Sequence, residues 1–168
     1  MRIFTLDSQI LLPKPIGEVF EFFSDARNLE LLTPPWLRFE VITPPPIEMR
    51  RGTLIDYRLR LRGIPIRWQS EITVWEPPFR FVDEQRRGPY RQWIHEHRFA
   101  ESGGQTLATD QVRYAVPGGS LVNKLFVGPD LRRVFAYRVE QMNRILGGPA
   151  GSGIAEQTQS RPRVDPGP

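Results

Sequence analysis

Hydrophobic and polar residues alternate along most of the chain before residue 117, which is the pattern of strands with one buried face. The alternation is clearest at 53–61, where Ile55, Tyr57 and Leu59 share one side and arginines occupy much of the other. The same two-residue period, bounded by proline and glycine turns, predicts further strands. These cover residues 3–11, 36–42, 66–74, 79–86, 91–99 and 106–116. We therefore expect a sheet of seven antiparallel strands.

Three segments repeat with the period of a helix instead. Residues 15–24 and 26–32 are predicted to form two short helices, and the second is ended by a pair of prolines. A wide apolar stripe over 121–146 predicts a long helix, and the stripe includes one charged residue, Arg138. Gly128-Pro129 should kink or interrupt this helix, because proline lacks a backbone N–H. The fold class is therefore α+β.

The composition supports one domain with its own core. Hydrophobic residues make up 39% of the 168 residues and aromatic residues 11%, which is enough apolar surface to offset the entropy of the chain. We place the domain at 1–147 and expect the remainder, 148–168, to be a disordered tail, because it is rich in Gly, Pro, Ser and Gln. The chain has no cysteine, which excludes disulfides and thiolate chemistry and favours a cytoplasmic location.

The charge pattern does not predict a nucleic-acid partner. The net charge is +4, but the arginines are dispersed along the predicted strands and do not gather in one basic block. The apolar run at the N-terminus is broken by Asp7 before it could form a signal sequence, and no apolar run approaches the roughly 18 residues of a membrane span. Transient contact with a membrane surface stays open, and the sequence does not indicate an oligomeric state.

The order of the predicted elements resembles one superfamily. A strand, two short helices, a meander and a long C-terminal helix are typical of the START-like and birch-pollen-allergen-like helix-grip proteins, the SRPBCC superfamily. This superfamily includes polyketide cyclase/dehydrase proteins and coenzyme Q-binding proteins. The segments that carry it are LTPPWL (32–37), WEPPFRF (75–81), QRRGPY (85–90), WIHEHRF (93–99) and DQVRYAVP (110–117). The resemblance covers roughly residues 1 to 147.

The resemblance implies a curved sheet wrapped around the long helix, with a cavity for an apolar ligand between them. Aromatic and aliphatic residues on the inner faces would form its wall, together with a few polar groups. For any single one of these residues, we favour ordinary core packing. The predicted ligand-binding residues are Tyr57, Leu59, Trp68, Phe81, Gln85, Trp93, His95, His97, Tyr114, Phe126, Val134 and Phe135.

A tight turn at Gly103-Gly104 sets the register of the last two predicted strands. The only two histidines of the chain then share one face with aromatic residues, which marks that face as the inner one. We therefore expect both histidines to point into the cavity. The predicted pairs are His97 with Asp110, His95 with Val112, and Trp93 with Tyr114.

The His97-Asp110 pair has two interpretations. The carboxylate would fix the tautomer of the imidazole and raise its basicity, as a general base requires. Alternatively, the pair is a cross-strand hydrogen bond that satisfies two buried polar groups. We favour the second, because no nucleophile or proton-donor motif accompanies the pair. His95 is equally suited to bind a ligand carbonyl or hydroxyl and to be a satisfied core residue.

The orientation of Asp83 and Gln85 depends on the loop at residues 87–89. A loop of three residues would turn both side chains inward beside the histidines, whereas a loop of two would turn them outward. We prefer three, because Phe79 and Phe81 then also face inward. An inward Asp83 with two histidines is a partial ligand set for zinc or iron. Since the set is incomplete, we expect no metal and no other cofactor.

We expect a binding or carrier protein for a hydrophobic small molecule, such as a lipid, an isoprenoid or quinone, or a polyaromatic compound. One alternative is a polyketide cyclase/dehydrase-like enzyme, in which His97 or His95 moves a proton and Asp110 or Asp83 orients the imidazole. Another is a stress-response or chaperone-like interaction module, whose contact face would lie near residues 29–36. Since no complete catalytic set is present, we favour binding over catalysis.

Overall fold

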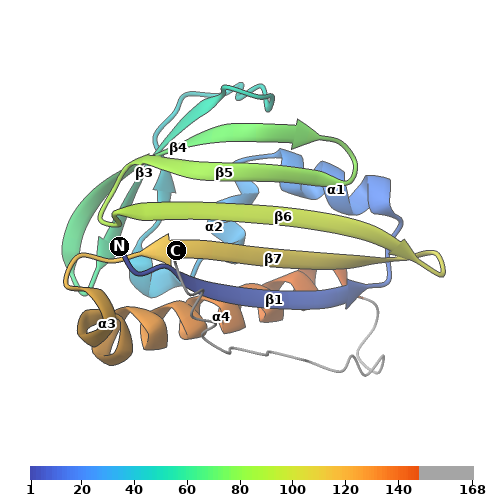
Figure 1. The fold of residues 1–168 in the computed structure, drawn as a ribbon. Helices are drawn as coiled ribbons and strands as arrows, with labels where there is room; N and C mark the ends of the chain where they lie inside the picture. The colour runs from blue at the N-terminus through green and yellow to red at the C-terminus, as the bar shows by residue number, and fades with distance from the viewer. Residues whose placement is uncertain (148–168) are drawn as a thin grey trace.

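One antiparallel sheet of seven strands organises the protein, and this computed structural model describes residues 1–147 (Figure 1). The strands are β1 (Phe4–Leu12), β2 (Glu40–Val41), β3 (Leu54–Leu61), β4 (Ile64–Glu76), β5 (Arg80–Arg87), β6 (Gln92–Ser102) and β7 (Gln105–Ala115). Across the sheet they follow the order β1-β7-β6-β5-β4-β3-β2. Strands β2 to β7 are therefore a meander, and β1 forms the opposite edge by pairing with β7.

The helices lie on one side of the curved sheet. They are α1 (Ile16–Ser24), α2 (Asn28–Leu32), α3 (Gly119–Val122) and α4 (Gly128–Leu146), with a 3-10 turn η1 (Pro35–Leu37) and a π-helical segment η2 (Asn123–Val127). Figure 1 shows α4 running along the sheet below β1 and β7. The α+β helix-grip fold and its two short helices after the first strand are confirmed. The predicted tail lies outside the described residues.

The strand predicted over 36–42 is wrong for most of its length. Pro34 and Pro35 start the 3-10 turn η1, which the chain leaves through Arg38 in the left-handed region at φ 45°. Only Glu40 and Val41 then pair with β3. Phe79, expected to face inward, lies in the turn before β5 and is 60% exposed.

Gly128-Pro129 was predicted to kink or interrupt the long helix, and the structure instead has a π-helical segment there. The chain stays helical from α3 into α4, but the residues just before Pro129 widen into the π-helical segment η2. The backbone N–H of Gly128 donates to the carbonyl of Asn123, five residues earlier. Pro129 is the second residue of α4 and donates no backbone hydrogen bond, so the widened segment η2 accommodates it within the continuous helix.

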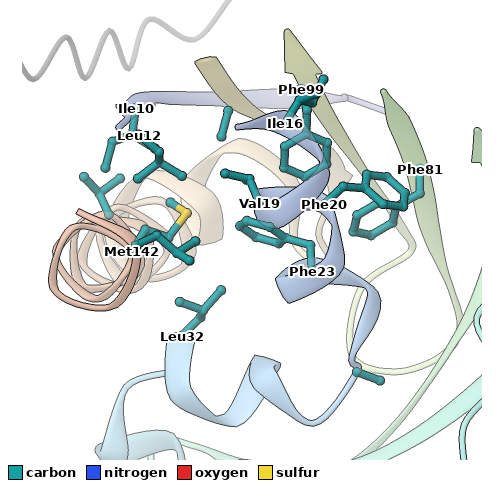
Figure 2. Close-up of a cluster of buried hydrophobic side chains, with 14 of the residues drawn as sticks. Ile10, Leu12, Ile16, Val19, Phe20, Phe23, Leu32, Phe81, Phe99 and Met142 are labelled. Carbon is teal, nitrogen blue, oxygen red and sulfur yellow. The ribbon is translucent and has the colours of Figure 1, made fainter. Parts of the chain in front are cut away.

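The first of two apolar clusters packs α1, α2 and the C-terminal half of α4 against the sheet (Figure 2). Phe20 of α1 meets Phe99 of β6 edge-on, with ring centroids 5.6 Å apart. On its other side, the same cluster includes Met142 of α4, which is 1% exposed. The short helices are therefore held by tertiary packing of their apolar faces.

The second apolar cluster lies at the other end of the interior, and a polar layer separates the two. It joins Leu131 and Phe135 of α4 to the start of β1 and the end of β7. Along α4, the buried Arg138 falls between Phe135 of this cluster and Val139 of the first. The buried Asp110 of β7 has the same position between Ala108 and Val112.

Candidate functional site

The β6-β7 hairpin places both histidines on the inner face of the sheet. Gly103 and Gly104 adopt positive φ angles of 58° and 79°, which a two-residue hairpin turn needs. All three predicted cross-strand pairs are present: His97 with Asp110, His95 with Val112, and Trp93 with Tyr114. His95 is 7% exposed and His97 is 2% exposed, so both rings are largely withdrawn from solvent.

Strand β5 adds Asp83 to the same face. Phe81 pairs with His97 and Asp83 pairs with His95, so both side chains point inward, as the longer loop predicted. The loop itself is longer than expected and covers residues 88–91 between the two strands. Gln85 lies beyond this ladder and exchanges hydrogen bonds with the backbone of Tyr90, at 2.8 and 3.3 Å.

Two carboxylates and two imidazoles form a closed network on this face. His97 Nε2 lies 2.8 Å from Asp83 Oδ2, and His97 Nδ1 lies 3.0 Å from Asp110 Oδ1. His95 Nε2 lies 2.9 Å from the same Asp110 oxygen. Because an ionised carboxylate only accepts hydrogen bonds, His97 Nε2 and His95 Nε2 each carry a proton. The His97 ring therefore lies between the carboxylates of Asp83 and Asp110.

Arg138 completes the network from α4. Its Nε donates to Asp110 Oδ2 at 2.8 Å, and its second nitrogen, Nη2, donates to Asp110 Oδ1 at 3.2 Å, a two-pronged contact. The apolar periodicity of 121–146 places Arg138 within the buried stripe and predicts no role for it. A positive charge on the buried face of a helix was the available signal, because such a charge is buried only when it is paired.

The two carboxylates stay ionised. Burial alone would raise the pKa of Asp110, but the positive charge of Arg138 and hydrogen bonds from His95 and His97 hold it well below its usual value. Burial also opposes the ionised form of Asp83, yet the hydrogen bond from His97 and the neighbouring positive charges lower its pKa. The network therefore contains two negative charges.

The two imidazoles differ in protonation. Burial disfavours the charged form of His97, but its hydrogen bonds to Asp110 and Asp83 raise its pKa above the ordinary value. Burial and the adjacent charge of His97 lower the pKa of His95. The surroundings of His97 thus favour its charged form, and those of His95 favour its neutral form.

Asp83, His95 and His97 offer ligand atoms within 4.8 Å of one another, as a metal site would. Their chemistry argues for charge pairing instead. Both ring nitrogens of His97 already approach carboxylates, and an Arg138 nitrogen lies 3.5 Å from His97 Nδ1, where it would repel a bound cation. Arg138 thus already supplies a positive charge at this group of residues.

A cavity of about 450 Å³ lies between the sheet and α4, within the range of small-molecule pockets. Eight of the predicted ligand-binding residues line it, and most are apolar or aromatic: Tyr57, Leu59, Trp68, Trp93, His95, Phe126, Val134 and Phe135. Asp83 and Arg138 also line it, so the ion-paired network forms one end of an otherwise largely apolar space.

The other four predicted residues do not line this cavity. Phe81 and His97 border a smaller cavity of about 20 Å³ beside α1, where their rings stack with centroids 4.0 Å apart. The side chain of Gln85 forms hydrogen bonds with the backbone of Tyr90 in the β5-β6 loop. The hydroxyl of Tyr114 donates to Asn123 Oδ1 at 3.0 Å and ties β7 to η2.

The exposed side chains at the other end mark the mouth of the cavity. Ile64 and Phe126 line it and are 63% and 46% exposed. Arg62, in the β3-β4 turn, forms a two-pronged ion pair with Asp130 of α4 at 2.9 and 3.1 Å. Its guanidinium also lies 5.0 Å from the centre of the Phe126 ring. This ion pair joins the two sides of the mouth.

The segment considered as an interaction face exposes two apolar side chains. Leu31 is 51% exposed and Trp36 is 50% exposed. The Trp36 ring packs edge-on against Tyr137 of α4, at 5.8 Å between centroids, and Arg133 covers it. Trp36 therefore contributes to holding η1 on α4.

The chain belongs to a family of known proteins. Residues 12–143 match the family described as polyketide cyclase/dehydrase and lipid transport, which is most of the chain. Membership in this family, part of the SRPBCC group suggested by the sequence, implies a fold that binds hydrophobic ligands. No curated protein matches the chain significantly.

Solved structures with the same fold come from bacteria and plants. A protein from Arthrobacter aurescens has a TM-score of 0.68 at 15% identity, with 87% of each chain covered. Ginseng major latex-like protein 151 from Panax ginseng has a TM-score of 0.63 at 11% identity, over 87% of this chain and 99% of that one. A nucleoside-diphosphate sugar epimerase from Corynebacterium glutamicum matches at 0.62 and 24% identity, over 83% of this chain but only 28% of its own. These likenesses concern the fold alone.

No helix within residues 1–147 is long and apolar enough to cross a bilayer.

Proposed function

We propose that the protein binds a hydrophobic small molecule, such as a lipid, an isoprenoid or quinone, or a polyaromatic compound, in the cavity between the sheet and α4. The observation that carries this proposal is a largely apolar space of about 450 Å³ between the sheet and α4. Folding normally fills such a space with side chains, since interiors pack closely. A space kept open and lined by aromatic residues is suited to a ligand.

The wall favours a flat or extended apolar ligand. Trp68 and Trp93 meet edge-on at 5.3 Å between centroids, and both line the cavity. Aromatic walls of this kind gain most from contact with rings or unsaturated chains. The polar end would orient the molecule. A carrier role needs no reacting group, and the network described above is balanced in charge without one.

Two measurements test the proposal. Native mass spectrometry of the protein purified from its own host should show a retained hydrophobic molecule. Pyrene fluorescence should report binding to the emptied protein, and Val134→Trp should weaken pyrene binding at least about tenfold, because Val134 lines the cavity.

Ala136→Trp is the matched control, since it adds the same side chain to the exposed face of the same helix. It should leave pyrene binding unchanged. If the purified protein retains no molecule and Val134→Trp does not weaken pyrene binding, the cavity is not a binding site.

A second candidate is a polyketide cyclase/dehydrase-like enzyme, and the position of His95 favours it. His95 is neutral and reaches the cavity, whereas both nitrogens of His97 are held by carboxylates. His95 would therefore be the proton acceptor, with Asp110 orienting its ring. A synthetic linear poly-β-ketone should then gain aromatic absorbance in the presence of the protein, and His95→Gln should abolish this. Equal rates with and without protein would exclude this activity on that substrate.

A further inference from the structure

The inner end of the cavity holds two hydrogen-bond acceptors side by side. His95 Nδ1 lies 3.7 Å from Asp83 Oδ2, too far for a direct hydrogen bond. His95 carries its proton on Nε2, which donates to Asp110, so Nδ1 presents a lone pair. The other carboxylate oxygen, Asp83 Oδ1, receives no hydrogen bond from any residue within 1–147.

Both acceptors can be reached from the cavity. Asp83 and His95 line it, and the Asp83 side chain keeps 19% of its surface exposed. Within the described part of the chain, no fully buried side-chain nitrogen or oxygen lacks a hydrogen-bond partner. Asp83 Oδ1 and His95 Nδ1 have no partner there, so neither atom is fully buried, and both belong to residues that line the cavity. Polar groups at the end of an apolar cavity select ligands that complete their hydrogen bonds.

The charges around this acceptor pair exclude two classes of ligand. A ligand carboxylate would meet the Asp83 carboxylate and two acceptors, and would gain no hydrogen bond there. A ligand ammonium would add a positive charge to a site where Arg138 already pairs with Asp110 and His97 already hydrogen-bonds to Asp83. A neutral hydroxyl adds no charge and supplies the missing hydrogen.

Two other polar side chains, those of Ser70 and Tyr57, also line the cavity. Ser70 accepts a hydrogen bond from Trp68 Nε1 at 3.0 Å, and Tyr57 beside it is also a hydrogen-bonding neighbour of Ser70. A ligand hydroxyl that donates to Asp83 or His95 would still have an oxygen to accept from Ser70 or from Tyr57, which also lines this end.

We propose that the cavity selects apolar ligands that carry a neutral hydroxyl group, an alcohol, phenol or enol, which donates to Asp83 and His95 at its inner end. This rests on the proposed binding function and names the class of ligand. Ketones, ethers and fatty-acid carboxylates of the same size are excluded from this contact because they have no neutral donor to offer.

Four pyrene derivatives test the selection, because they share one ring system and differ in one group. Hydroxypyrene should bind at least about tenfold more tightly than methoxypyrene, as expected for a hydrogen bond to a charged acceptor. Pyrene carboxylate and aminomethylpyrene should bind more weakly than hydroxypyrene. Equal affinities for hydroxypyrene and methoxypyrene would overturn the proposal, and so would tightest binding of the carboxylate or the amine.

The outcomes distinguish this proposal from the proposed function. If no pyrene derivative binds, the binding function fails. If all bind equally, the cavity binds ligands but Asp83 and His95 do not select them.

Asp83→Asn assigns the selection to the acceptor pair. It replaces one carboxylate oxygen with a donor and should reduce the preference for hydroxypyrene over methoxypyrene to less than about threefold. Glu84→Gln is the matched control, because Glu84 is next on β5 but faces away and binds Thr73 and Arg86. It should keep the full preference. An unchanged preference in Asp83→Asn would overturn the assignment.

A measurement on the unaltered protein covers the case in which Asp83→Asn does not fold. Nitrogen NMR of the His95 ring should show hydroxypyrene moving the Nδ1 resonance strongly and methoxypyrene moving it little, because only the hydroxyl donates to this atom. Equal effects of the two compounds would contradict the proposed contact.

Discussion

Arg138 of α4 and Asp110 of β7 face each other across the interior, with Arg138 Nε 2.8 Å from Asp110 Oδ2 and both side chains less than a tenth exposed. This pair is the direct polar link between the long helix and the two-histidine face of the sheet. Charges so deeply buried are costly to separate, because the one left behind has neither water nor a partner.

Arg138→Met should therefore lower the free energy of unfolding by about 3 kcal/mol or more, since it leaves Asp110 buried and unbalanced. Adding Asp110→Asn to the same chain should restore part of the loss, because the unpaired charge is then removed. Urea unfolding of the single and double variants measures both values. Strictly additive losses would show that the two side chains do not interact.

Arg58→Met is the control for removing an arginine from an ion pair. Arg58 lies 2.6 Å from Glu40, but both side chains are 57% exposed. Its loss should cost less than about 1 kcal/mol, as exposed pairs do.

The pKa values of the two histidines are expected to lie on opposite sides of 6.5, the ordinary pKa of an imidazole. The pKa of His97 lies above that value, so its contribution to stability is complete below pH 6.5 and is lost as the pH rises through the folded pKa. The pKa of His95 lies below it, so its contribution is present above pH 6.5 and is lost as the pH falls through the folded pKa. Stability should therefore decline in both directions.

Nitrogen NMR of the imidazole rings measures these titrations directly. At pH 6.5 the His97 ring should be mostly protonated and the His95 ring mostly neutral. His95→Gln assigns the two signals by removing one of them. Two rings that titrate together near the ordinary value would contradict the assigned charges.

The ion pair between Arg62 and Asp130 should control how fast ligands pass the mouth. Asp130→Asn should speed both uptake and release of pyrene at least about twofold in stopped-flow fluorescence, because the β3-β4 turn is then no longer tied to α4. Added salt should speed exchange in the unaltered protein and have little effect in the variant, since salt screens exposed charges. Glu40→Gln, which breaks an ion pair elsewhere, should leave the rates unchanged.

The sequence predicted the sheet well where alternation and turns agreed. The glycine pair at 103–104 was enough to set the register that brings His97 opposite Asp110. The segment 36–42 was mistaken because its apolar residues suited a strand, while two prolines and a left-handed Arg38 ended the pairing. Local backbone geometry outweighed side-chain pattern there.

The site was only partly predictable for a different reason. Periodicity assigned the two histidines and Asp83 to one face, but it could not show which carboxylate each ring nitrogen meets. His97 was predicted opposite Asp110 with Asp83 nearby, and its two ring nitrogens lie beside Asp110 and Asp83. Arg138 was missed because the pairing that permits its burial comes from a strand distant in sequence.

The polar layer between the two apolar clusters also sets a depth. A molecule that enters past Ile64 and Phe126 meets the charged side chains of Asp83 and Arg138 and can go no further without breaking their ion pairs. If the cavity binds a ligand as proposed, this polar layer would set the greatest length of ligand that fits inside. A longer ligand would then leave part of its chain in water.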